Sequence, residues 1–269
     1  MKIYFYQQIF LNPDNIFLRT TGLATTRATP LAAEDMSRDA PNLTQAAYEA
    51  VRADLLACRI HPGSRLKIQE LCARFSVGLG AIREALSRLT SEGLVVAEPQ
   101  RGFRAAPISV ADLRDLTMVR IQIEGLCLRR AIAVGTVDWE ARLVAAFHRL
   151  SRTPERAAAD PVRADDDWAA AHAAFHLALV EGGDSPWLLR LHSQLYAQSE
   201  RYRRLSIPLD TAARDVGAEH QAILDVVLAR EADRAVELLT RHLAATAAIL
   251  LAADIEGHAA GLKPGPDSE

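Results

Sequence analysis

Apolar positions recur along most of this chain with the period of an α-helix. Ile68, Leu71 and Phe75 lie at three- and four-residue spacings, which predicts a short helix with one apolar face. The same period resumes between residues 81 and 93. Residues 76–80, between the two, include two glycines, and we expect their conformational freedom to form a tight turn. The pattern therefore predicts two helices joined by a sharp corner.

Segments on either side complete a small domain. Residues 43–60 predict a third helix, and residues 94–97 and 103–106 predict two short strands around a basic turn. This order is typical of a winged helix-turn-helix, whose recognition helix enters a DNA major groove while the wing reaches a minor groove. A plain three-helix bundle with a surface hairpin is the alternative. The candidate DNA-contacting residues are Arg65, Lys67, Arg83, Ser87, Arg88, Arg101, Gly102 and Arg104.

The rest of the chain is predicted to be helical. Its apolar period, interrupted by glycine and proline, indicates helices at 109–134, 138–151, 165–181, 185–204, 212–229 and 231–254. The predicted fold class is mainly α, with an N-terminal winged helix-turn-helix and a C-terminal all-α helical bundle. The predicted divisions are an extension that is either disordered or an upstream start (1–36), the winged helix (37–107), the helical effector-binding domain (108–255) and a tail (256–269).

Charge and cysteine content fit a DNA-binding protein of the cytoplasm. Residues 37–107 hold ten Lys and Arg against seven Asp and Glu, although the whole chain has a net charge of -3. The three cysteines, Cys58, Cys72 and Cys127, lie in apolar patterns without metal-site spacing, which favours reduced core residues. No apolar run approaches the length of a membrane span, and the first residues do not resemble a signal peptide. We therefore expect a cytoplasmic protein without a membrane partner.

Four histidines have spacings that suggest a metal site. His172 and His176 are four residues apart, so one helix face presents both imidazoles. His220 and His242 each lie in an apolar helical pattern and are expected to point inward. Neutral imidazoles on facing helices suit Zn²⁺, Ni²⁺ or a similar divalent ion. From the residues alone, ordinary core or surface histidines remain the alternative, and His148 and His192 are interpreted that way.

The run PGSRLKIQELCARFSVGLGAIREALSRLTSEGLVVAEPQRGF resembles the winged helix of the GntR family of bacterial transcription regulators. The resemblance implies a homodimer on a palindromic double-stranded DNA operator. It also implies that Arg83 contacts a base or phosphate and that Gly102 forms the wing tip. Leu79 stands where relatives carry an arginine, and the glycine-rich turn is similar to the carbon-starvation, glutarate-responsive branch.

The second half is similar to the FCD domain of FadR-type GntR regulators, an antiparallel helical bundle that binds small carboxylates, often with a metal. The shared motifs are R-x-x-x-E at Arg120 and Glu124, F-H at 175–176, E-H at 219–220 and R-H-L at 241–243. The resemblance implies a ligand set of His172, His176, His220 and His242, with His172 in a position where most relatives have Asp. It also implies that Arg120 clamps a carboxylate. Tyr202 and Arg203 are further effector candidates, although the run RYRR at 201–204 is equally consistent with a solvated basic patch.

These patterns together predict a non-enzymatic, ligand-responsive transcription regulator, and repression is the expected mode. The expected cofactor is a divalent metal ion, zinc or nickel, and the expected effector is a small carboxylate or dicarboxylate. Two alternatives stay open. A bundle of histidines around an ion can also activate water, which would make the chain a metal-dependent enzyme. The ion itself could instead be the sensed ligand.

Overall fold

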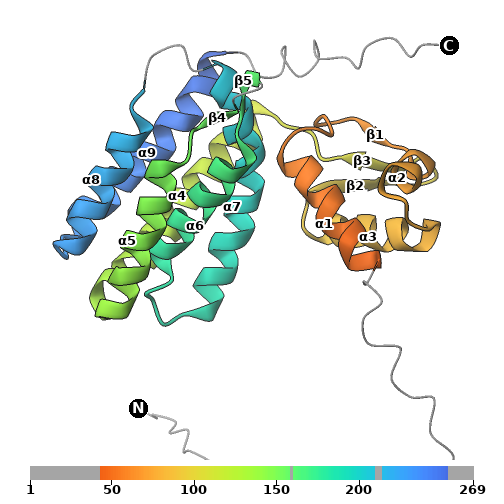
Figure 1. Ribbon diagram of the computed structural model, residues 1–269. Coiled ribbons are helices and arrows are strands. Elements are labelled where there is room, and N and C mark those ends of the chain that lie inside the picture. The colour runs from red at the N-terminus through yellow and green to blue at the C-terminus, as the bar shows by residue number, and fades with distance from the viewer. Residues whose placement is uncertain (1–42, 158–159, 210–213, 254–269) are drawn as a thin grey trace, which may run out of the picture. The chain divides into compact units, whose positions relative to one another are not determined.

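The computed structural model describes residues 43–157, 160–209 and 214–253. Within these ranges the chain folds into nine α-helices, one 3₁₀ turn and five short strands (Figure 1). The mainly α fold class with a small wing sheet is confirmed. The predicted extension at 1–36 and tail at 256–269 lie outside the described residues, and the domain boundaries remain predictions.

The winged helix has three helices and a three-stranded antiparallel sheet in the order β1-β3-β2. Its elements are α1 (Leu43–Leu56), β1 (Arg65–Leu66), α2 (Ile68–Phe75), α3 (Leu79–Ser91), β2 (Val95–Glu98) and β3 (Gly102–Ala105). One apolar core joins them, with Val51, Ile82, Leu86 and Leu89 fully or almost fully buried. The apolar faces read from the sequence therefore meet as expected, while β1, only two residues long, carried too little pattern to be predicted.

The corner between α2 and α3 differs from the prediction. The left-handed residue is Ser76, with φ of 54°, whereas Gly78 is extended at φ of -73° and Gly80 lies inside α3. A Cβ added at either glycine would meet nothing within 4 Å. Neither glycine adopts a left-handed conformation in this turn. The expectation that the turn depends on the conformational freedom of both glycines was therefore wrong. Gly93, with φ of +74°, lies just beyond the end of α3 in the left-handed conformation that commonly follows a helix.

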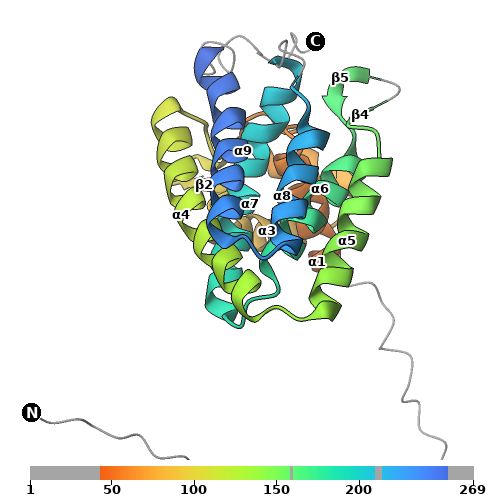
Figure 2. The ribbon, with the colours of Figure 1, turned by 90° about the vertical axis from the view of Figure 1, so that its left-hand side faces the viewer.

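The second part of the chain is a bundle of six helices, all close to their predicted positions (Figure 2). They are α4 (Val110–Val134), α5 (Val137–Arg152), α6 (Asp166–Val180), α7 (Pro186–Ser206), α8 (Val216–Leu228) and α9 (Ala232–Ala252). Ser109 caps the start of α4, because its hydroxyl accepts from the Asp112 N–H at 3.1 Å. Asp165 caps α6 by accepting from two backbone N–H groups, those of Asp167 and Trp168.

Apolar side chains fill the bundle. Trp139 and Phe175 are the largest of those that are almost fully buried, and the Trp139 indole N–H donates to the Ala178 carbonyl at 2.7 Å. α4 packs against α7 and α9, while α5 packs against α6 and α8. A hairpin of β4 (Arg156–Ala157) and β5 (Asp160–Ala164) links α5 to α6, and η1 (Ile207–Leu209) follows α7. The hairpin was not predicted, because its strands are too short to show an alternating pattern.

The last helix is long and apolar enough to cross a membrane by length and composition alone. α9 has 21 residues and a hydropathy of 1.4 over its most apolar window. Core helices of bundles meet the same criteria, and α9 packs against α4, α7 and α8. Its inward face carries Leu239, His242 and Leu250, all buried. We therefore interpret α9 as a core helix.

Candidate metal centre and effector cavity

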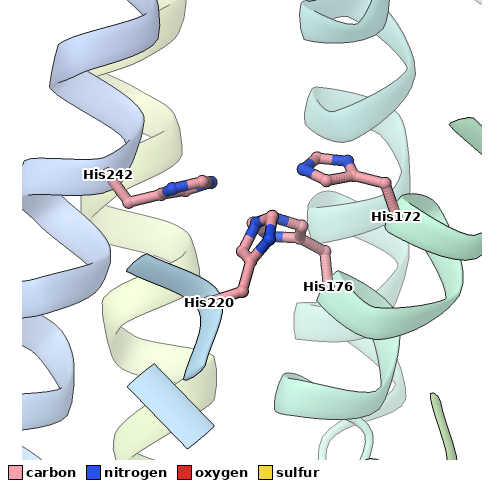
Figure 3. Close-up of side chains that lie close together, drawn as sticks. All are labelled: His172, His176, His220 and His242. Carbon is pink, nitrogen blue, oxygen red and sulfur yellow. The ribbon is translucent and has the colours of Figure 1, made fainter. Parts of the chain in front are cut away.

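Three helices bring the four predicted histidines together inside the bundle. His172 and His176 lie one turn apart on α6, His220 comes from α8 and His242 from α9 (Figure 3). One ring nitrogen of each lies within 4.8 Å of the others, and all four side chains are buried. Ligand atoms about 2.1 Å from a tetrahedral zinc ion are about 3.4 Å apart, so side-chain adjustments of about 1 Å would bring all four into range.

Burial keeps these imidazoles in the neutral form that binds metals. Loss of solvent lowers the pKa of His172 and of His220 well below the usual value, and the neighbouring histidines lower them further. Burial also lowers the pKa of His242 to about 4, although Glu219 opposes the shift. Near neutral pH the cluster is therefore uncharged and each ring has one nitrogen with a free lone pair.

Several ring nitrogens in the cluster have no partner within the protein. Both nitrogens of His176 and Nε2 of His220 are buried without a hydrogen bond. Such groups cost free energy unless they are satisfied, by about 1–3 kcal/mol each. Four neutral nitrogens of borderline softness around one point suit zinc or nickel. The residues present thus fit a divalent ion.

Glu219 contacts the cluster from α8. Its Oε2 lies 2.8 Å from Nδ1 of His242, and Arg214 donates to both carboxylate oxygens, at 2.7 and 2.5 Å. Burial alone would raise the pKa of Glu219, but the bonds from His242 and Arg214 outweigh it and lower the pKa to about 2. Sequence reasoning missed Arg214, which lies just before α8, because spacing within the predicted helix at 212–229 does not show that this side chain contacts Glu219 and His242.

Glu124 is the second carboxylate at the site, and it is only 1% exposed. It pairs with Arg120 one turn earlier, and its oxygens lie 3.8 Å from His176 Nδ1 and 3.9 Å from His192 Nε2. Burial would raise the pKa of Glu124, but the charge of Arg120 and the contact with His176 hold it below the usual range. His192, predicted to be a surface or packing residue, is buried beside this carboxylate, whereas His148 is exposed.

A cavity of about 250 Å³ adjoins the histidines, and its lining includes His172, His176 and His242. Two of the three predicted effector residues face it with unused donors. Arg120 Nη2 and Arg203 Nη1 are buried without a hydrogen-bond partner. The remaining donors of Arg203 bond Glu200, at 2.9 and 2.5 Å, and its guanidinium lies 4.9 Å from the Trp168 ring.

Tyr202, the third effector candidate, also lines the cavity, but its hydroxyl is occupied. It donates to Asp112 at 2.6 Å and accepts from the Ser109 N–H at 3.2 Å. Burial raises the pKa of Tyr202, and the bond to Asp112 raises it further. Its position indicates a role in anchoring α7 to the start of α4. The Arg203 side chain is only 11% exposed and pairs with Glu200, so it does not belong to a solvated basic patch.

The predicted DNA-contacting residues differ in their contacts within the protein, although Arg65 and Lys67, which have such contacts, are also exposed. Arg83 and Ser87 are exposed on α3, and Arg101 and Gly102 are exposed at the wing tip, where Gly102 has φ of +91°. Arg88 lies about 140° around the helix from Arg83, because five residues separate them. It donates to Gln45 at 2.9 Å and stacks over Tyr48. Arg88 is therefore a packing residue of α1 and α3 in this structure.

The other three basic candidates have partners within the winged helix. Arg65 donates to the Arg101 carbonyl at 2.9 Å, and Lys67 pairs with Glu70 at 2.7 Å. Arg104 pairs with Glu98 at 3.0 Å while remaining 41% exposed. These contacts hold the basic side chains against the wing and the start of α2.

Comparison with known proteins gives the family. Residues 43–104 match the model of bacterial regulatory proteins of the gntR family, and residues 115–245 match the FCD domain. An uncharacterized HTH-type transcriptional regulator, BphR of Paraburkholderia xenovorans, is 42% identical over 209 residues, which cover 78% of this chain and 85% of that protein. The HTH-type transcriptional repressor GlaR of Escherichia coli is 34% identical over 200 residues, covering 73% of this chain and 90% of GlaR.

Solved structures share the fold. McbR/YncC of Escherichia coli superposes with a TM-score of 0.66 at 19% identity, covering 78% of this chain and 97% of that one. A putative GntR transcriptional regulator from Rhodococcus sp. RHA1 gives a TM-score of 0.61 at 24% identity, with 77% and 97% covered. Together with the two family models and the curated relatives, these findings show that the chain belongs to the gntR family of bacterial transcription regulators, in the group that carries an FCD domain.

Proposed function

We propose that this regulator is a cytoplasmic homodimer that represses transcription from a palindromic operator and responds to a small carboxylate bound beside a divalent metal ion. One observation carries the proposal. Three of the four clustered histidines, His172, His176 and His242, border the same cavity as the unused N–H donors of Arg120 and Arg203. The relatives, which carry the names of transcription regulators, favour this function over a metal-dependent enzyme.

His172, His176, His220 and His242 would hold the ion, with zinc or nickel the best match to four imidazoles. When bound, the ion would supply a Lewis-acidic position for one carboxylate of the effector. The chain itself provides the rest of the recognition. Arg120 and Arg203 each offer a buried N–H, and a charge-assisted hydrogen bond from such a donor to a carboxylate is stronger than one between neutral groups. A dicarboxylate would satisfy both the ion and a guanidinium.

The proposed response is an equilibrium between two arrangements of the dimer. A ligand shifts such an equilibrium only by the difference between its affinities for the two states. In our proposal the acid favours the arrangement in which the two recognition helices no longer match successive major grooves of the operator. Arg83, Ser87, Arg101 and Gly102 are the contacts we assign to the DNA, because they are exposed on α3 and at the wing tip.

A thermal-shift screen of small mono- and dicarboxylates on the full-length protein tests the effector. A ligand at about 100 times its Kd adds about 2.7 kcal/mol of stability. We expect a hit with the metal-loaded protein, and its loss in Arg203→Gln but not in the control Arg142→Gln, whose side chain is 57% exposed on α5. If no acid stabilises the protein and the metal alone changes its affinity for DNA, the result would favour sensing of the ion instead.

Removal of the metal with a chelator distinguishes DNA binding from the response to the acid. Metal-free protein should still bind a DNA site selected from a random library, because the winged helix has its own apolar core. It should no longer release that site when the acid is added. Retention of the full acid response after verified metal removal would contradict the proposed role of the ion.

A further inference from the structure

We propose that Glu219 and Glu124 are positioning residues of the metal site: each carboxylate takes the Nδ1–H of one histidine and so turns that ring's Nε2 toward the shared centre. This inference rests on the proposed metal site and deepens it. It assigns roles to two acidic residues that are not among the four ring ligands, and it specifies which nitrogen of His242 and of His176 binds the ion.

The hydrogen-bonding chemistry of His242 gives the strongest support. An ionised carboxylate can only accept hydrogen bonds, so the contact of 2.8 Å between Glu219 Oε2 and His242 Nδ1 requires the proton on Nδ1. The neutral ring then has its lone pair on Nε2, which is the atom left to bind a metal. Histidines that ligate metals commonly donate their other ring N–H to a carboxylate or carbonyl in this way.

Arg214 holds Glu219 in place. Its Nη2 donates to Glu219 Oε2 at 2.5 Å and to the carbonyl oxygen of His242 at 2.8 Å, and it also lies 3.2 Å from Nδ1 of His242. The two hydrogens of Nη2 are used by the carboxylate and the carbonyl, so the closer oxygen of Glu219 is the partner of Nδ1. One guanidinium thereby fixes a carboxylate of α8 against a ligand of α9.

Glu124 and Arg120 form a similar carboxylate–guanidinium pair near His176. Arg120 pairs with one of its oxygens and donates to Ser199 at 2.7 Å, while the other oxygen lies 3.8 Å from Nδ1 of His176. That separation is longer than a hydrogen bond, and both nitrogens of His176 are unpartnered. A modest ring movement that brings Nε2 onto an ion would let Nδ1 donate to Glu124. His192 faces the same carboxylate, with Nε2 at 3.9 Å.

The other two histidines of the cluster, His172 and His220, differ from His242 and His176 in their partners. Nδ1 of His172 lies 2.8 Å from the Tyr196 hydroxyl, which can donate or accept and therefore does not select a tautomer. Among the described residues, no carboxylate lies within ion-pair distance of His172 or His220. The carboxylate pairing is thus a property of two particular ligands rather than of the whole cluster.

Metal affinity of the full-length protein tests the assignment. Protein freed of metal is titrated with Zn²⁺ against a chromophoric chelator, and with Co²⁺ to record its visible absorption spectrum. Loss of an outer partner of a metal ligand usually weakens metal binding about 10–100-fold. We expect losses of that size for Glu219→Gln and Glu124→Gln, with a shifted Co²⁺ spectrum. The matched control is Glu181→Gln, because Glu181 pairs with Arg142 at 2.8 Å and contacts no histidine.

A second measurement does not depend on how well the variants fold. Long-range ¹H–¹⁵N spectra of the metal-free wild-type protein report the tautomer of each ring, and we expect the proton of His242 on Nδ1. A proton on Nε2, or glutamine variants that bind zinc as tightly as the control, would overturn the inference while leaving the metal site intact. Wild-type protein that binds no metal would instead defeat the proposed site itself, before any variant is compared.

Discussion

Acid sensitivity of the metal-free bundle follows directly from the buried histidines. The pKa of His242 is about 4 in the folded chain, whereas an unfolded histidine has a pKa of about 6.5. Between these values the unfolded chain binds a proton that the folded chain does not. Stability therefore falls as the pH falls through this window and is fully retained above it. Going from about pH 7 to about pH 5, His242 alone should cost about 2 kcal/mol.

His172 and His220 should add to the loss, because burial also lowers their pKa values. The assay is urea unfolding of full-length protein without metal at several pH values, comparing wild type with His242→Gln, which cannot titrate. We expect the variant to lose about 2 kcal/mol less than wild type over the same range. His148→Gln serves as the control, since His148 is exposed on α5. An equal pH dependence for wild type and His242→Gln would refute the reasoning.

Further predictions concern the DNA interface and His172, the proposed metal ligand that stands where most relatives have Asp. Arg83→Ala should weaken binding to a selected specific site by about 1–3 kcal/mol in gel-shift titrations, and unchanged affinity would remove Arg83 from the interface. Arg101→Ala should weaken binding evenly across sequences and reduce the slope of log affinity against log salt by about 1, whereas a sequence-dependent loss with an unchanged slope would contradict a phosphate or groove contact. His172→Asp should keep the ion, because a carboxylate oxygen also ligates zinc, and loss of metal from this variant would count against the assigned ligand set.

Periodicity was sufficient to predict most of the fold. Apolar residues recur over several turns in the bundle helices and predict them as helices, and in α5 they also define a clear inward face, whereas α6 is apolar on nearly all sides. The hairpin at 156–164 and the strand at 65–66 were missed because strands this short show no alternation. The corner at Ser76 shows a different limit, since glycines permit a left-handed turn without requiring one there.

The candidate site was only partly readable from the sequence. His172 and His176 share a helix face by spacing, and family resemblance joined His220 and His242 to them. Glu219 adjoins His220 in the chain but contacts His242 on another helix, and such a pairing depends on how helices pack. The partner of that carboxylate, Arg214, lies outside any helix.

Which basic side chains are exposed on the recognition helix could also be decided only from the structure. Arg83 and Arg88 are both basic and both on α3, and the sequence placed them together on the outward face. Five residues of helix separate their directions by about 140°, which turns Arg88 onto Tyr48 of α1. Ser87, four residues after Arg83, shares its face and stays exposed.

The central claim is that four histidines form one metal site in the sensor bundle, and the metal content of the purified protein tests it most directly. Full-length protein prepared without chelators should contain about one zinc or nickel ion per chain by elemental analysis. His220→Ala should lose the ion and keep its affinity for DNA, while the control His148→Ala should keep both. Wild-type protein without a divalent ion, or an equal metal content in wild type and His220→Ala, would contradict the account.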